Sequence, residues 1–209
     1  MKSSILNRIK ALGGNIDNVK GKSVVDDILS ISFNTVLYQR PTDTPWANAE
    51  DEEPIYGIGE FVDENMDLFN TDKNAFYNKL IEKYFRNTDE GFGQTFWVGK
   101  LFTPFREGSS DFEEWNDDFI DDEVTNLEEI TKLTKNPKSD FIHLFYDYGY
   151  PDHMYMSLSD PNLENPTLFG TDHEVFFNEI SNEGTLEDYL STFMTKKELL
   201  EIVKNKLEK

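Results

Sequence analysis

The sequence predicts an α+β fold, with one domain over residues 1–209 and a central mixed or antiparallel sheet flanked by helices. Three observations predict it. Residues 71–87 place apolar side chains at helical spacing. Residues 141–148 and 153–160 form two strand-like runs on either side of a turn. The 17 Phe and 9 Tyr favour a folded aromatic core, because disordered chains are poor in such residues.

The first forty residues predict two short helices and a strand. Residues 3–12 have apolar side chains on one helical face, a serine near the start as a cap, and Gly13 as the stop. Ser23 is the predicted cap of the second helix. Residues 31–38 are rich in strand-forming side chains.

The next stretch, between Arg40 and Lys73, contains ten acidic residues and no basic one. Its prolines predict a loop in which Trp46 anchors the chain to the core. Residues 55–61 (IYGIGEF) are interpreted as a short strand or an extended segment. Their two glycines form only G-x-G with no helix start after them, so the pattern does not indicate a phosphate-binding loop.

Residues 71–87 are the clearest predicted helix, with Thr71 as its cap. Apolar side chains recur at i, i+1, i+4, i+5, i+8 and i+9, which is one continuous stripe. We interpret this stripe as core. Residues 95–105 (TFWVGKLFTPF) then predict a strand. The stripe consists of Phe76, Tyr77, Leu80, Ile81, Tyr84 and Phe85.

Residues 111–123 (DFEEWNDDFIDDE) hold eight carboxylates among thirteen positions. On a helix, the interleaved Phe112, Trp115, Phe119 and Ile120 would form one apolar stripe, with carboxylates on the other faces. The segment is either a solvated surface held down by its rings or an acidic ridge for a basic partner. The EF-hand pattern is absent, and a glycosidase pair would need two carboxylates held in a cleft.

This acidic segment is the predicted partner-binding site. Its carboxylates would steer a basic protein by long-range attraction, and Trp115, Phe112 or another exposed ring would supply the anchor. The predicted binding residues are Asp111, Phe112, Glu113, Glu114, Trp115, Asp117, Asp118, Asp121 and Asp122.

The remaining chain predicts a short helix or strand at 126–134, and then the hairpin. Residues 141–148 are apolar on both faces, which is typical of a central, covered strand. The sequence YGYPD turns the chain into the strand HMYMSLSD, and a short strand TLFG follows a loop. Thr185 and Thr195 are the predicted caps of two final helices.

Composition excludes several classes of function. A net charge of −21 argues against binding nucleic acid or an anionic membrane, because such affinity comes from Lys and Arg. The absence of cysteine excludes disulfides, thiolate zinc sites and a cysteine nucleophile. There is no signal-peptide pattern and no apolar run long enough to cross a bilayer, so a cytoplasmic location is expected.

The three histidines invite a metal or catalytic interpretation. Asp152-His153 and Asp172-His173-Glu174 contain good ligand types, but adjacent strand residues point to opposite faces. The sequence also lacks H-E-x-x-H, G-x-S-x-G, Walker A and dinucleotide motifs. We therefore expect no metal, no cofactor and no enzymatic activity. The alternative is a carboxylate- or metal-dependent hydrolase that uses Asp172, His173 and Glu174.

The back half of the chain resembles the SUKH superfamily of Smi/Knr-like proteins and bacterial toxin-immunity proteins. The resemblance lies in residues 141–194 and rests on YGYPD, MYMSLSD, ENPTLFG, TDHE and GTLEDYLSTFM. Residues 1–100 depart from the pattern and are a divergent or added front half beside the family-like segment 139–195. The matching positions are Asp160, Asn165, Pro166, Asp172, His173, Leu186, Tyr189, Leu190 and Phe193.

The resemblance implies a SUKH-like α+β domain that acts as an immunity protein in the bacterial cytoplasm. Such a protein neutralises a polymorphic toxin domain, often a nuclease, by direct binding. The acidity of this chain fits that expectation, because a nuclease active site is basic. A general regulatory or adaptor protein of the same superfamily is a further alternative.

Overall fold

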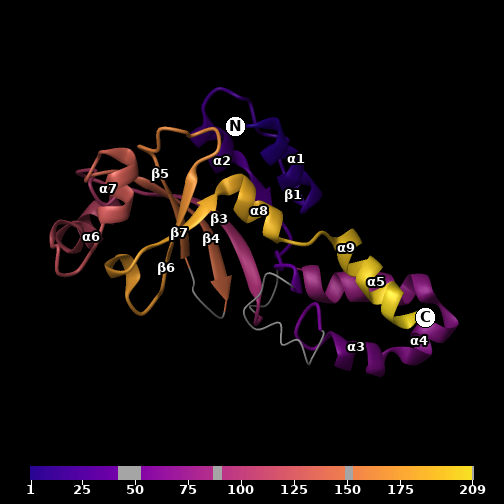
Figure 1. The fold of residues 1–209 in the computed structure, drawn as a ribbon. Coiled ribbons are helices and arrows are strands. Elements are labelled where there is room, and N and C mark those ends of the chain that lie inside the picture. The colour runs from indigo at the N-terminus through magenta and orange to yellow at the C-terminus, as the bar shows by residue number, and fades with distance from the viewer. Residues whose placement is uncertain (42–52, 87–90, 149–152, 209) are drawn as a thin grey trace.

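The computed structural model describes residues 1–41, 53–86, 91–148 and 153–208, and it has an α+β fold, as predicted. A five-stranded sheet lies at the centre, with helices around it (Figure 1). All of its strand pairs are antiparallel and join strands in chain order, so the sheet is a meander rather than mixed. Its strands are β3 (Gln94–Phe102), β4 (Phe141–Tyr148), β5 (His153–Ser157), β6 (Thr167–Thr171) and β7 (Ser181–Thr185).

The helices fall into three groups around this sheet (Figure 1). The first group is α1 (Ser3–Ala11), α2 (Val24–Ser30) and α8 (Leu186–Thr192). The second is α6 (Ser110–Ile120), α7 (Glu128–Thr134) and the 3₁₀ turn η2 (Phe176–Asn178). The third is α3 (Ile58–Glu64), α4 (Met66–Thr71), α5 (Lys73–Phe85) and α9 (Lys196–Leu207). A small sheet pairs β1 (Gly14–Asn15) with β2 (Ser32–Phe33).

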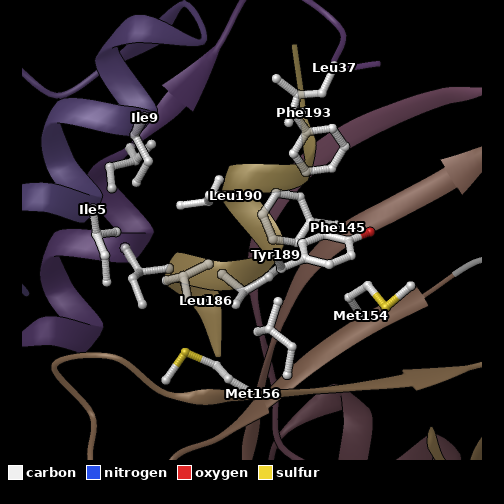
Figure 2. Close-up of a cluster of buried hydrophobic side chains, with 14 of the residues drawn as sticks. Ile5, Ile9, Leu37, Phe145, Met154, Met156, Leu186, Tyr189, Leu190 and Phe193 are labelled. Carbon is white, nitrogen blue, oxygen red and sulfur yellow. The ribbon is translucent and has the colours of Figure 1, made fainter. Parts of the chain in front are cut away.

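The first group of helices covers one face of the sheet and forms a core with it. Ile5 and Ile9 of α1 pack with Leu186 and Leu190 of α8 above the sheet (Figure 2). Met156 of β5 lies in the same cluster (Figure 2). These side chains are buried because each helix presents its apolar stripe to the sheet.

A second core lies on the opposite face and consists mainly of rings. Phe102, Phe141, Tyr155 and Phe169 come from four neighbouring strands, and Phe119 of α6 packs on them. The third core joins α3, α4, α5 and α9 around Phe61, Phe76 and Leu80. The predicted stripe of the helix at 71–87 belongs to this third core, as expected.

Several predicted helix starts are confirmed. Ser23 accepts a hydrogen bond from the Asp26 N–H, and Thr185 and Thr195 each close a capping box. Two predicted caps are wrong. Thr71 ends α4, while the side chain of Asp72 caps α5, and no serine side chain caps α1, whose cap position is Lys2.

The strand predicted at 55–61 is also wrong, because a helix begins there at Ile58. Gly57 precedes it with φ of 75°, a left-handed conformation that glycine adopts without a steric penalty. Ile58 and Phe61 are three residues apart, so a helix buries both on one side. Of the strand predicted at 31–38, only β2 is a strand, and isolated bridges such as that of Leu37 with Thr95 follow it.

The hairpin of β4 and β5 is confirmed, and β4 is buried on both faces. A β-bulge between His143 and Phe145 changes the expected alternation. Phe145 therefore joins Leu144 in the core under α8, instead of sharing a face with Phe141. The turn at 149–152 and the predicted anchor Trp46 lie outside the described residues.

Candidate functional site

The acidic segment at 111–123 is largely helix α6, as its spacing predicts. Ser109 caps the helix by accepting a hydrogen bond from the Phe112 N–H at 3.1 Å, and its hydroxyl donates to the Thr103 carbonyl at 3.0 Å. Acidic residues in the first turn suit the positive end of the helix dipole. The helix thus begins at a point that is tied to the end of β3.

The inner side of α6 is committed to the aromatic core. Phe119 is 4 % exposed, and its ring centroid lies 4.8 Å from that of Phe177. The Trp115 ring lies 4.9 Å from Phe176, so this half-buried side chain packs on η2. Ile120 is 58 % exposed, which corrects the prediction that it shares the buried stripe.

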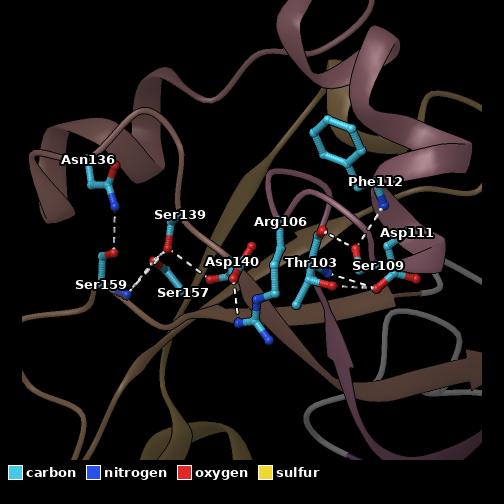
Figure 3. A network of polar contacts seen from close by, with 10 residues as sticks. All are labelled: Thr103, Arg106, Ser109, Asp111, Phe112, Asn136, Ser139, Asp140, Ser157 and Ser159. Carbon is cyan, nitrogen blue, oxygen red and sulfur yellow. Dashed lines mark hydrogen bonds and ion pairs between the residues drawn. The ribbon is translucent and has the colours of Figure 1, made fainter.

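Asp111 points toward the sheet rather than toward a partner. Its carboxylate accepts hydrogen bonds from the Thr103 N–H at 2.8 Å and from the Thr103 hydroxyl at 3.1 Å (Figure 3). Phe112 is half-buried beside it. Of the predicted binding residues, Asp111 and Trp115 therefore hold α6 in place, and Asp118 is only partly exposed.

The remaining predicted carboxylates are exposed on or just after α6, as is Ile120, and we call these residues the acidic outer face. Within the described residues, the carboxylates of Glu114, Asp117 and Asp122 form no side-chain hydrogen bond or ion pair. Their negative charges are thus not neutralised by a described neighbour. The acidic outer face consists of Glu113, Glu114, Asp117, Ile120, Asp121 and Asp122.

A polar network joins the base of α6 and α7 to the sheet (Figure 3). Arg106 pairs with Asp140 at 2.6 Å. The hydroxyls of Ser139 and Ser157 lie 2.5 Å apart, and the Ser159 N–H donates to both. Ser139 and Ser157 are 2 % and 0 % exposed. A substrate cannot reach hydroxyls this deeply buried, so the network supports the fold rather than nucleophilic chemistry.

Two of the three histidines, His143 and His153, lie together, an arrangement that neither Asp-His sequence pattern indicated. His143 on β4 and His153 on β5 meet, with Nε2 and Nδ1 3.1 Å apart. Burial, and then the neighbouring His153, lower the pKa of His143 to about 4, so it is neutral at pH 7. His143 precedes the hairpin turn and His153 follows it, so the sequence pattern could place them on neighbouring strands, but the strand register and its bulge decide that their rings meet.

The proposed hydrolase residues form a surface turn. The Asp172 carboxylate accepts a hydrogen bond from the Glu174 N–H at 2.6 Å and lies 3.5 Å from His173 Nδ1. His173 is 60 % exposed. Among the described residues, no three His, Cys, Asp or Glu side chains converge as a metal-ligand group.

The positions that resemble the SUKH pattern have structural roles here. The Asp160 carboxylate accepts hydrogen bonds from the N–H groups of Asn162 at 2.7 Å and Thr167 at 2.8 Å. Asn165 accepts one from the Glu187 N–H at 2.9 Å. These bonds tie the loop between β5 and β6 to the start of α8. They explain why a buried aspartate and asparagine stand in that loop.

Comparisons with known proteins add no relative. No protein-family model, curated protein or solved structure matches this chain. Among the helices that the structure describes, none has the length and apolar character needed to cross a membrane.

Proposed function

We propose that this chain is a cytoplasmic binding protein that neutralises a cognate bacterial toxin by direct contact through its acidic outer face. The partner is a basic protein, and a nuclease domain fits best because its substrate-binding surface must attract phosphates. The protein acts by occupying that surface and performs no chemistry itself.

The observation that carries the proposal is the contrast between the two sides of α6. Its inner side is fixed to the aromatic core by Phe119 and Trp115. Its outer side presents the exposed Ile120 and exposed carboxylates, of which Glu114, Asp117 and Asp122 form no side-chain hydrogen bond or ion pair within the described residues. A rigid helix that displays charge around an apolar residue has the usual layout of an interface, with an apolar centre and a polar rim.

Charge and apolar contact would have separate roles in binding. The carboxylates raise the association rate through long-range attraction, which salt screens. Ile120, rather than Trp115 or Phe112, supplies the apolar anchor in the interface, because its side chain is the more exposed. The resemblance of residues 141–194 to SUKH immunity proteins is a second support for this function.

The test is binding to a toxin domain, which is sought first among the products of the neighbouring genes. We expect the variant Glu114→Lys, Asp117→Lys, Asp122→Lys to bind at least about tenfold more weakly, mostly through a slower association rate. The substituted side chains are exposed on or just after α6, so the fold is expected to survive. Surface plasmon resonance at low and high salt would measure both rates, and co-expression would show whether the toxin still arrests growth.

The matched control reverses three exposed acids on the helices of the third core, namely Asp63, Glu64 and Asp67. It has the same net charge as the α6 variant. Equal losses in both variants would mean that total charge, not this face, controls binding. Unchanged binding of the α6 variant would exclude the acidic outer face. A gene with no neighbouring toxin, whose product binds a protein of its own cell, would indicate the adaptor function instead.

A further inference from the structure

His143 and His153 form an imidazole pair on the sheet face opposite α8. His143 stacks on Tyr155 with ring centroids 4.7 Å apart, and His153 stacks on Tyr146 at 5.3 Å. Both side chains are half-buried. Two flanking tyrosines thus restrict the rotamers of both imidazoles, so the facing nitrogens are held in place before anything binds.

The two ring axes that run through the facing nitrogens are not collinear. At the observed nitrogen separation of 3.1 Å, a hydrogen bond along both ring axes would place the centroids about 5.4 Å apart. Two imidazoles bonded to one ion at about 2.1 Å would place them about 4.8 Å apart. The observed centroid separation is 4.9 Å. The centroid separation is therefore closer to that of two ligands sharing an ion than to that of a hydrogen bond along both ring axes.

A third donor atom lies beside His143 Nε2. The Phe145 carbonyl oxygen lies 2.9 Å from His143 Nε2. A regular strand directs its carbonyls within the sheet and its side chains out of it, so this contact depends on the bulge between His143 and Phe145. The bulge thus places an oxygen donor beside one of the two nitrogen donors.

We propose that His143, His153 and the Phe145 carbonyl bind a divalent transition-metal ion, with Cu²⁺ the preferred one. Nitrogens 3.1 Å apart subtend about 95° at an ion about 2.1 Å from each, which suits tetragonal Cu²⁺. A tetrahedral ion would separate them by about 3.4 Å. Among the described residues this donor set holds no carboxylate, so it disfavours Ca²⁺ and Mg²⁺. Lys100, which pairs with His143 in the register, is exposed, so solvent screens its opposing charge.

The test is a Cu²⁺ titration of the full chain with excess Mg²⁺ to occupy surface carboxylates and glycine as a competing ligand. We expect one equivalent to bind, with hyperfine coupling to two nitrogens in the electron paramagnetic resonance spectrum. His143→Gln and His153→Gln should each weaken the affinity by about tenfold or more. His173→Gln, which removes the exposed third histidine, is the matched control and should bind as the parent does.

Circular dichroism would establish that each variant is folded. If His143→Gln does not fold, His153→Gln alone decides the outcome. The proposal is overturned if the parent binds no Cu²⁺ against glycine or if both hairpin variants bind as tightly as the parent. It is equally overturned if only His173→Gln loses the ion. None of these outcomes bears on toxin binding, which uses a different part of the molecule.

Discussion

Asp111 and Asp117 lie on the same helix, yet they have opposite roles. Asp111 accepts two hydrogen bonds from Thr103, whereas Asp117 is exposed to solvent. A carboxylate that satisfies a backbone N–H contributes to stability, and an exposed one is available for a partner. Sequence treats these residues alike, because the difference depends on which side of α6 meets the sheet.

Glu198 provides a prediction about pH at the same scale. Burial alone would raise the pKa of Glu198, but hydrogen bonds from the Thr195 N–H and the Arg40 guanidinium outweigh it and lower the pKa to about 2. The ionised form is thus favoured in the folded state. Its contribution to stability is present above about pH 4.5 and is lost as the pH falls toward 2.

We expect this loss to be about 1–2 kcal/mol, since the side chain is more than a third exposed and solvent screens the pair. Urea unfolding at about pH 6 and about pH 3 would measure the larger part of it, because some of the contribution remains until the pH reaches about 2. Glu198→Gln should reduce the pH dependence by that amount. Glu201→Gln, on the exposed side of the same helix, should not. Equal pH dependence in parent and Glu198→Gln would contradict the assignment.

At the scale of elements, α6 shows what the spacing of apolar residues predicts and what it does not. The spacing of Phe112, Trp115, Phe119 and Ile120 predicted the helix, and the helix is there. It also predicted one buried stripe, but Ile120 lies at the last residue of the helix and points away from the core. Periodicity identifies the apolar side of a helix, while the position of its end relative to the sheet decides what is covered.

A pair of substitutions on α6 tests this division. Phe119→Ala should destabilise the fold by about 3–5 kcal/mol, because it removes a ring from the buried aromatic core. Ile120→Ala should change stability by less than about 0.5 kcal/mol and should weaken partner binding. Denaturant unfolding measures both. Similar losses of stability in the two variants would show that Ile120 is buried after all.

Other elements depended on contacts that no local pattern reveals. The polar segment of β7 (SNEGT) has no strand signature and is a strand because it pairs with β6. Residues 55–61 were predicted as a strand, but Ile58 and Phe61 lie in α3, and the third core buries both side chains together. Tertiary packing outweighed local preference in both cases.

At the scale of the whole molecule, the charge of −21 sets a further prediction. Repulsion among so many carboxylates destabilises the folded state, and salt screens it. We therefore expect the melting temperature to rise by a few degrees between about 0.05 and 0.5 M NaCl. Each Asp→Lys or Glu→Lys change shifts the charge by two units, so the α6 triple variant has −15 and should respond less. A fall in melting temperature with salt would contradict this account.

The sequence by itself determined the α+β class, the β4–β5 hairpin, the caps Ser23, Thr185 and Thr195, and the acidity of α6. These features are local, because periodicity, capping and charge act over a few residues. Only the tertiary structure decided which carboxylates face solvent, and that His143 meets His153. The first depends on which side of α6 packs on the sheet, and the second on a bulge that shifts one strand of the hairpin against the other.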